Sequence, residues 1–248
     1  MTLKFVSCPS PNHDARPDGA AVDILVLHYT GMKTADEALA RLCDPEAKVS
    51  AHYTIGRDGR IFAHVPEERR AWHAGVSWWA GEKNINGRSI GIELVNPGHE
   101  FGYIPFTQAQ IAALIDLAQG ILKRHPIPAN RVLGHSDVAP ARKEDPGELF
   151  PWAELAEFGI GLWPSPPQHG GSEQQRTNER AKRGRVGDEL SAEDLARFGY
   201  GLPPHTDVPL QSVITAFQRH FRPGEINGHW DGECAGALAA LLSPKIVG

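Results

Sequence analysis

Cysteine and long apolar runs are both scarce in this sequence. The three cysteines, Cys8, Cys43 and Cys234, are far apart along 248 residues and include no Cys-x-x-Cys pair, which argues against a disulfide framework and a thiolate zinc site. The longest apolar stretches, such as AGALAALL, are much shorter than the ~20 residues that span a bilayer. The N-terminal segment also lacks the apolar run of a secretory signal. We therefore expect a soluble, cytoplasmic protein without a transmembrane segment, with export of a longer precursor as the alternative.

Basic residues do not outnumber acidic ones. The chain has 25 Lys and Arg against 30 Asp and Glu, a net charge of −5, with both signs interspersed. A broad positive field, which non-specific binding to nucleic acid or anionic membranes requires, is therefore missing, and we expect neither partner. What the sequence has in number is histidine, with 12 residues. Metal and proton chemistry are the first functions to look for, and nothing in the sequence indicates an oligomeric state.

Strand and helix patterns alternate through the first 163 residues. Strand patterns occur at 22–29, 50–65 and 89–96, the second of them as two stretches around Asp58-Gly59, which predicts a hairpin. Helices are expected after Thr34 and Thr107, because each is followed three residues later by Glu or Gln in a capping box. These patterns predict an α/β fold with a mixed β-sheet flanked by helices.

The composition changes after Trp163. Residues 164–190 begin rich in proline and glycine and contain almost no large apolar side chains, as in a linker, and three short helical patterns follow. We predict an α/β domain in 1–165, a linker in 166–185 and a small three-helix module in 186–248. Since each flanking part has its own apolar pattern, we expect the module to be separable from the function of the first domain.

Two histidines stand at the C-terminal ends of predicted strands, His28 in 22–29 and His135 in RVLGH. Zinc hydrolases use three His or carboxylate ligands on rigid elements and leave one position for water. A single strand-end histidine is more often an ordinary hydrogen-bonded imidazole, and the third ligand stays open. Asp137 would share the face of His135 if its strand continued, whereas Asp145 lies in a loop, so the residues alone favour Asp137. Other histidines compete as ligands: His52, His64, His73 and His99.

Glu93 lies in the centre of the apolar strand SIGIELVN. A carboxylate there costs free energy to bury unless it has a partner or a function, and Gly91 on the same face leaves room for a ligand. The alternative is a glutamate that faces water from a half-exposed strand. Lys143, judged by its surroundings alone, is an ordinary loop lysine.

Blocks of the first 165 residues resemble, in order, the zinc-dependent N-acetylmuramoyl-L-alanine amidases, which include AmpD-like and AmiD-type enzymes. The blocks are LHYTG, VSAHYTIGRDGRI, VPEERRAWHAGVSWW, NINGRSIGIELVNPG, PFTQAQIAALI and GHSDVAPARKEDPGELFPW. The tail, with VITAFQRHFRPGEINGHWD, resembles the peptidoglycan-binding module of the AmiD type. The resemblance implies the mixed sheet that the family shares with phage lysozyme-type amidases and peptidoglycan recognition proteins.

The resemblance also implies roles for particular residues. It makes His28, His135 and Asp145 the ligands of a zinc ion, in place of the Asp137 favoured by the residues alone. It makes Glu93 the general base and Lys143 the group that stabilises the oxyanion.

Four further positions are implied as substrate-binding residues. Lys48 occupies a place where the recycling enzymes carry an arginine that holds the stem peptide, whereas Asn84 replaces a second such arginine and puts their narrow substrate preference in doubt here. His52, Trp72 and His73 match positions in the groove or behind the ligands.

The implied activity is zinc-dependent hydrolysis of the amide between N-acetylmuramic acid and L-alanine in peptidoglycan or muropeptides, in bacterial cell-wall turnover and recycling. One alternative is a recognition protein that binds wall fragments without cutting them. A zinc endopeptidase that cuts within the stem peptide is another. The presence of every implied ligand and of Glu93 favours a hydrolase over a binding protein, while the preferred form of the substrate stays open.

Overall fold

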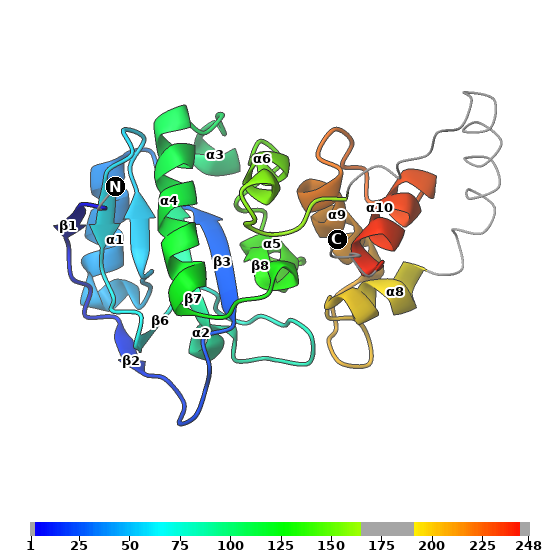
Figure 1. The fold of residues 1–248 in the computed structure, drawn as a ribbon, viewed down its shortest axis with the longest axis horizontal. Helices are drawn as coiled ribbons and strands as arrows, with labels where there is room; N and C mark the ends of the chain where they lie inside the picture. The colour runs from blue at the N-terminus through cyan, green and yellow to red at the C-terminus, as the bar shows by residue number, and fades with distance from the viewer. Residues whose placement is uncertain (1–2, 165–190, 244–248) are drawn as a thin grey trace.

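The computed structural model describes residues 3–164 and 191–243 (Figure 1). Its core is a six-stranded sheet with the order β1-β5-β4-β7-β3-β8, in which β4 and β5 are antiparallel and the other neighbours parallel. The strands are β1 Phe5–Ser7, β3 Ile24–Tyr29, β4 Tyr53–Ile55, β5 Ile61–Ala63, β7 Ser89–Leu94 and β8 Val132–Gly134. A separate antiparallel pair joins β2 His13–Ala15 to β6 Arg69–Ala71. The predicted mixed sheet and the hairpin at Asp58-Gly59 are confirmed.

The central strands β3 and β7 are buried along almost their whole length because both carry near-continuous apolar sequence. Their parallel register sets Leu25 opposite Ile90 and His28 opposite Glu93. Since side chains alternate between faces, one face of the sheet is aliphatic and the other becomes polar where the strands end.

Helices surround the sheet, and both predicted capping boxes, Thr34 with Glu37 and Thr107 with Gln110, are confirmed. The α-helices are α1 Ala35–Cys43, α2 Ile85–Arg88, α3 Gly98–Phe101, α4 Gln108–Arg124, α5 His135–Val138, α6 Trp152–Glu157, α8 Ser191–Phe198, α9 Leu210–Phe221 and α10 Gly232–Leu242, with 3-10 turns η1 Pro45–Ala47 and η2 Ala129–Arg131. Among the described residues, none of the helices has the length and apolar character needed to cross a membrane.

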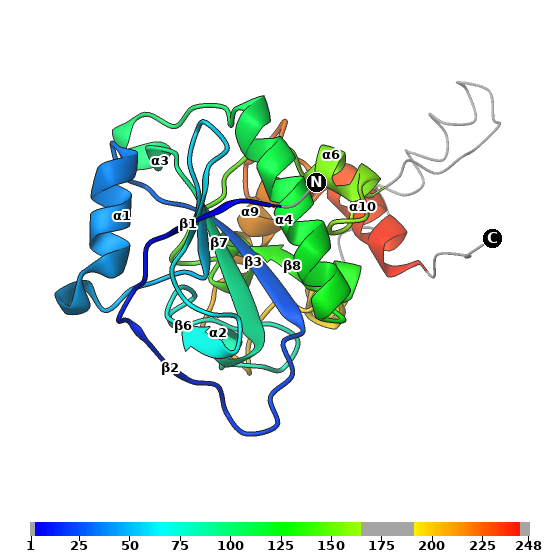
Figure 2. The ribbon, with the colours of Figure 1, turned by 60° about the vertical axis from the view of Figure 1, so that its left-hand side comes forward.

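Two apolar clusters lie against the sheet. In the first, the α4-side cluster, helix α4 covers the aliphatic face (Figure 2), with Leu25, Leu27, Ile90, Ile92 and Leu94 against Ile111, Leu114, Ala118 and Ile121. In the second, the tail-side cluster, residues of the sheet-bearing part join residues of the C-terminal part: Ile24, Val26, Trp79, Leu133 and Val138 with Leu195, Phe198, Tyr200, Val213, Phe217 and Phe221.

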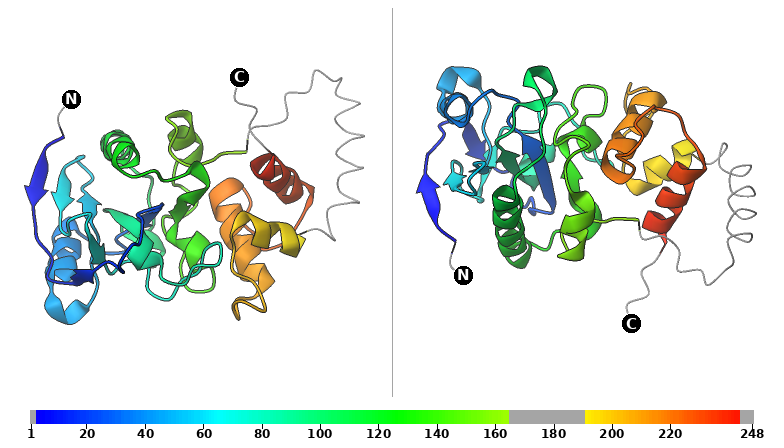
Figure 3. Two further views of the ribbon diagram at one scale, coloured as in Figure 1. Left: turned by 60° about the horizontal axis from the view of Figure 1, so that its bottom comes forward. Right: turned by 90° about the horizontal axis from the view of Figure 1, so that it is seen from above.

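The C-terminal helices therefore share a core with the sheet-bearing part of the chain. In both views of Figure 3 they lie on the side of β8 and α5, opposite the N-terminal strand. The indole of Trp79 packs edge-on against Tyr200 with ring centroids 4.9 Å apart, and Trp152 stacks on His220 at 3.7 Å. This packing argues against a separable module, because the apolar faces of the two parts cover each other. The predicted linker, 166–185, lies outside the described residues.

Candidate active site

Three buried side chains converge at the C-terminal ends of β3 and β8. The Nδ1 atoms of His28 and His135 are 3.0 Å apart, and each lies 3.0 Å from Oδ2 of Asp145. Leu27 and Gly134 are in register in the parallel strands, which brings the two histidines that follow them together. Asp145 reaches the cluster from the loop after α5, where its carbonyl accepts a hydrogen bond from Ser136 at 2.9 Å. One carboxylate and two imidazoles in a triangle of this size form a candidate metal site.

The outer ring nitrogen of each histidine is held by a hydrogen bond. Nε2 of His135 lies 3.0 Å from the carbonyl oxygen of Ala74, to which it must donate because a carbonyl only accepts. Arg142 donates to the same oxygen at 2.7 Å and so fixes its position. A neutral His135 therefore presents an unprotonated Nδ1 to the cluster, the form in which histidine binds a metal.

A hydrogen bond to His73 fixes the same tautomer in His28, with the proton on Nε2. The hydroxyl of Ser89 donates to the carbonyl of Ile85 at 2.7 Å, so its oxygen accepts from Nε2 of His73 at 3.1 Å. Nδ1 of His73 is then an acceptor, and Nε2 of His28 donates to it at 3.0 Å. Burial, and next the proximity of His135, lower the pKa of His28 to about 4, so the imidazole is neutral at neutral pH. The chain from Ile85 thus leaves Nδ1 of His28 free for a metal.

Asp145 is ionised in this arrangement. Burial alone would raise the pKa of its carboxyl, but the two imidazoles that face Oδ2 outweigh burial and hold the pKa below its usual value. The cluster therefore offers one carboxylate oxygen and two imidazole nitrogens.

Glu93 stands beside this cluster on β7, opposite His28 in the register. Its side chain is buried, and Oε2 has no hydrogen-bond partner among the described residues. Burial, and next the charge of Asp145, raise the pKa of Glu93 well above its ordinary value. The expectation of space at Gly91 is wrong, since a Cβ there would lie 2.5 Å from the ring of His73, whose imidazole occupies that space.

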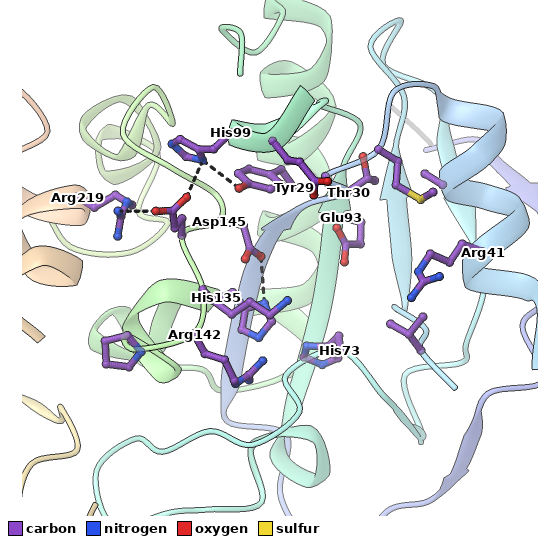
Figure 4. Close-up of a pocket in the computed structure, with 18 of the residues that line it drawn as sticks. Tyr29, Thr30, Arg41, His73, Glu93, His99, His135, Arg142, Asp145 and Arg219 are labelled. Carbon is purple, nitrogen blue, oxygen red and sulfur yellow. Dashed lines mark hydrogen bonds and ion pairs between the residues drawn. The ribbon is translucent and has the colours of Figure 1, made fainter. Parts of the chain in front are cut away.

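A pocket of about 810 Å³ opens over these groups. Figure 4 shows Glu93, His73, His135 and Asp145 at its centre, with Arg41 and Arg219 on opposite sides. Lys143 also lines the pocket, and its ammonium has no ion-pair partner in 3–164 or 191–243. The pocket therefore combines a candidate metal site, a protonatable carboxyl and several cations.

A family model described as N-acetylmuramoyl-L-alanine amidase matches residues 18–148, more than half of the chain. The chain belongs to this family. The amidase is 42% identical over 238 residues to N-acetylmuramoyl-L-alanine amidase AmiD of Escherichia coli K12, with 89% of this chain and 82% of AmiD covered. It is 37% identical over 164 residues to the 1,6-anhydro-N-acetylmuramyl-L-alanine amidase AmpD of the same strain, covering 59% of this chain and 87% of AmpD.

Two solved structures are similar over most of the amidase. The complex of E. coli AmiD with the substrate anhydro-N-acetylmuramic acid-L-Ala-D-gamma-Glu-L-Lys has a TM-score of 0.75 and 40% identity over 91% of each chain. AmpDh3 of Pseudomonas aeruginosa has a TM-score of 0.76 and 40% identity over 91% of this chain and 92% of its own. Because each match covers 91% of this chain, it extends beyond residue 190 into the region of the C-terminal helices.

Three of the residues implied by resemblance lie outside the pocket. Lys48 is exposed at the end of η1, and Trp72 is half-buried. His52 is fully buried behind His73, where its Nδ1 accepts a hydrogen bond from the backbone of Gly91 at 3.0 Å. This hydrogen bond indicates that His52 supports strand β7. His73, in contrast, lines the pocket itself.

Asp137, which the residues alone favoured as third ligand, contributes no atom to the cluster. The strand ends at Gly134 and the chain turns into α5, so the two-residue periodicity does not continue from His135. Asp137 accepts hydrogen bonds from the backbone of Gly134, Nδ1 of His220 and the hydroxyl of Tyr200, each at 2.7 Å. Its carboxylate fastens the C-terminal helices to the turn that carries His135.

Sequence reasoning missed that α9 forms one wall of the pocket. Ser212, Thr215 and Arg219 all line it. The guanidinium of Arg219 lies 3.6 Å from Glu144 and 3.9 Å from Glu148, on the loop that carries Asp145. The available signal was the helical period of 210–221, which predicts a helix but not the surface on which it docks.

Proposed function

We propose that this amidase hydrolyses the bond between N-acetylmuramic acid and L-alanine in soluble muropeptides, with zinc held by His28, His135 and Asp145. The observation that carries the proposal is the triangle of three donor atoms, each 3.0 Å from the other two. The position of Glu93 beside it, with an unpartnered buried oxygen, supports the same function.

The donor set fits zinc. Two imidazole nitrogens and one carboxylate oxygen are the ligands of many hydrolytic zinc sites, which keep a further position for water or substrate. Both imidazoles use Nε2 for a hydrogen bond and turn Nδ1 toward the metal position, and Asp145 adds a carboxylate oxygen. Zinc bound there supplies a Lewis acid and lowers the pKa of bound water toward ~7.

Glu93 is suited to move the proton. Its raised pKa allows the carboxyl to accept a proton from the attacking water near neutral pH and to deliver it to the departing amide nitrogen. Because Oε2 has no partner among the described residues, it is free to make that contact.

Lys143 is suited to stabilise negative charge on the carbonyl oxygen. Its side chain is partly buried in the pocket lining, two residues before Asp145. A cation fixed where charge develops contributes about 10²–10³ in rate.

The class of substrate follows from the pocket and from the relatives. The similar AmiD and AmpDh3 structures hold anhydro-N-acetylmuramic acid with a tripeptide and an anhydromuramic pentapeptide. Such ligands carry carboxylates along the peptide, and Arg41 and Lys143 supply cations in the lining of this pocket. We therefore propose anhydro-muropeptides as substrates.

Product analysis tests the reaction. The amidase is incubated with an anhydro-muropeptide and the products are identified by mass spectrometry. We expect free stem peptide with an N-terminal alanine and intact anhydro-N-acetylmuramic acid. Fragments cut within the peptide would indicate an endopeptidase, and an unchanged ligand bound by zinc-loaded protein would indicate a recognition protein.

Metal analysis tests the ligand set. We expect about one zinc per chain, lost in Asp145→Ala and retained in Asp137→Asn, which keeps the shape of a buried carboxylate. The opposite result would restore Asp137 as the ligand.

We also propose that the C-terminal helices hold the amidase on polymeric wall, as their resemblance to peptidoglycan-binding modules implies. The test is a pull-down of the Glu93→Gln protein with insoluble wall, with the pocket saturated by soluble muropeptide. Retention under saturation is expected, because a second contact does not compete with the pocket. Complete release would assign all wall binding to the pocket.

A further inference from the structure

A second group of metal-ligating and redox-active side chains lies away from the active site. Cys8, Cys43 and His64 bring their ligand atoms within 4.8 Å of one another. The two Sγ atoms are 3.3 Å apart although the cysteines are separated by 35 positions in the chain. Both cysteines are free and partly buried. The two thiols are in contact. Two kinds of chemistry join such a pair, a shared metal ion or a disulfide bond.

The backbone on both sides of the thiols is fixed. The amide of Cys8 donates to the carbonyl of Ala63 at 3.0 Å and so extends the pairing of β1 with β5. The side-chain amide of Asn12 donates to the carbonyls of Asp44 and Val49 at 2.8 and 2.9 Å, just after α1 ends at Cys43. The N-terminal segment and the end of α1 are thus fastened together, and the thiols have little freedom to separate.

The hydrogen bonds of His64 argue against a metal at this place. Its Nδ1 lies 2.7 Å from the carbonyl oxygen of Cys8 and must donate a proton to it. The lone pair of the neutral ring is therefore on Nε2, 2.9 Å from the hydroxyl of Thr54. Nδ1, the nitrogen 3.9 Å from Sγ of Cys43, has no lone pair for a metal. The sulfur separation of 3.3 Å is also shorter than the ~3.8 Å between two thiolates on tetrahedral zinc.

We propose that Cys8 and Cys43 are a disulfide site that fastens helix α1 to the N-terminal strand. The bond forms by exchange with a low-molecular-weight disulfide: a Cys8 or Cys43 thiolate displaces one thiol from it, and the second cysteine displaces the other. One S–S bond is broken and one formed, and the two electrons and two protons of the cysteines leave in two small thiols. The step needs no other reactant.

The bond would act on a wall of the active-site pocket. Ala38, Arg41 and Leu42 of α1 line the pocket, and Cys43 directly follows them. The loop that the bond closes, residues 8–43, contains His28. In a compartment with a reduced thiol pool the pair stays as two thiols, and in an oxidising one it closes. Burial, and next the adjacent Cys8 thiol, raise the pKa of Cys43 to about 12, which makes closure slow at neutral pH.

The test uses the full chain in glutathione buffers of graded redox ratio, followed by alkylation and mass spectrometry. We expect loss of two of the three free thiols, a linked Cys8–Cys43 peptide, and a melting temperature higher by about 5–10 °C than that of the reduced protein. Cys8→Ser and Cys43→Ser should each abolish the link and the shift. Cys234→Ala, which removes the third cysteine, should retain both.

Two results would overturn the proposal. Mixed glutathione adducts on single cysteines, without the linked peptide in either wild type or Cys234→Ala, would show that the sulfurs do not join. Binding of a second zinc per chain to the reduced protein, lost in Cys43→Ser while the first is kept, would make the group a metal site. Neither readout depends on amidase activity.

Discussion

The two faces of the central sheet are covered in different ways. Helix α4, which follows β7 closely in the chain, covers one face with an aliphatic cluster. The other face carries the buried His28, Glu93 and His135 at the strand ends, and its cover includes helices from beyond residue 190. The face with the active-site residues therefore depends on a distant part of the chain for its cover.

Removing the distant cover should have the largest effect. In a chain that ends at residue 164, Trp79, Leu133, Val138 and Trp152 lose partners, at roughly 1.5–3 kcal/mol for each large apolar side chain exposed. The sum approaches the ~5–15 kcal/mol that stabilises a typical domain. We expect this fragment to aggregate or to melt far below the full chain, as measured by calorimetry.

Co-expression of residues 191–248 with that fragment is the matched control, because it restores the cover without the covalent connection. We expect the two pieces to purify together and to regain activity. A fragment ending at residue 164 that is as stable and active as the full chain would show that the catalytic domain stands alone.

Substitution of Glu93 should have the next largest effect and should change activity instead of folding. Glu93→Gln keeps the shape but cannot accept a proton, so we expect turnover of muropeptide to fall by about 10³–10⁴. Zinc content and melting temperature should be retained. Glu157→Gln, an exposed position on α6, is the control for a lost surface charge. Turnover near that of wild type in Glu93→Gln would remove the general-base role.

Loss of the Lys143 charge should have a smaller effect. Lys143→Met keeps most of the length of the side chain without the cation, and we expect a fall of about 10²–10³ in kcat with little change in KM. A rise in KM alone would make Lys143 a substrate-binding group that does not act in the transition state.

Much of the difference between the aliphatic and the polar face of the sheet could be predicted from the sequence, because it follows from patterns among neighbouring residues. The apolar strands at 22–29 and 89–96, the capping boxes and the face shared by Gly91 and Glu93 depend on neighbouring residues. The roles of Asp137 and α9 could not be predicted from the residues. They depend on contacts with Tyr200 and His220, 63 and 83 positions away in the chain, and on a turn at His135 that ends the strand period.

Buried histidines should make the polar face the acid-sensitive one, and His52 allows a test away from the ligands. Burial, and next the charge of Arg16, lower the pKa of His52 from 6.5 to about 3. Below pH 6.5 the unfolded chain therefore binds a proton that the folded chain does not, and stability falls as pH falls, by about 1.4 kcal/mol per pH unit.

The imidazole accepts from the backbone of Gly91 and donates from Nε2 to the carbonyl of Arg69 at 3.1 Å. Glutamine can replace both hydrogen bonds, since its amide accepts at the oxygen and donates at the nitrogen. Between pH 6.5 and 4.5, His52→Gln should lose about 2 kcal/mol less unfolding free energy than wild type in urea titrations. Parallel losses in the two proteins would show that His52 titrates normally when folded.

The smallest expected effect is a difference in stability between two tyrosine variants, one on each face of the sheet. Tyr200 donates to Asp137 at 2.7 Å in the tail-side cluster, and Tyr53 donates to Glu67 at 2.8 Å beside the α4-side cluster. Tyr200 is 2% exposed, so its removal leaves a buried carboxylate short of one donor, at about 1.5–3 kcal/mol. Glu67 keeps hydrogen bonds from Arg124 and His125, so Tyr53→Phe should cost less than about 1 kcal/mol.

Urea unfolding of Tyr200→Phe and Tyr53→Phe measures the difference between their losses of stability. Zinc content and kcat show whether the loss also reaches the active site. The backbone of Gly134 and the ring of His220 still hold Asp137 in Tyr200→Phe, so we expect kcat within about threefold of wild type despite the lower stability. If Tyr200→Phe instead lost zinc or most of its activity, the C-terminal helices would position the turn at His135 as well as cover it. Equal stability losses in the two variants would mean that the faces do not differ in how strongly they depend on their polar contacts.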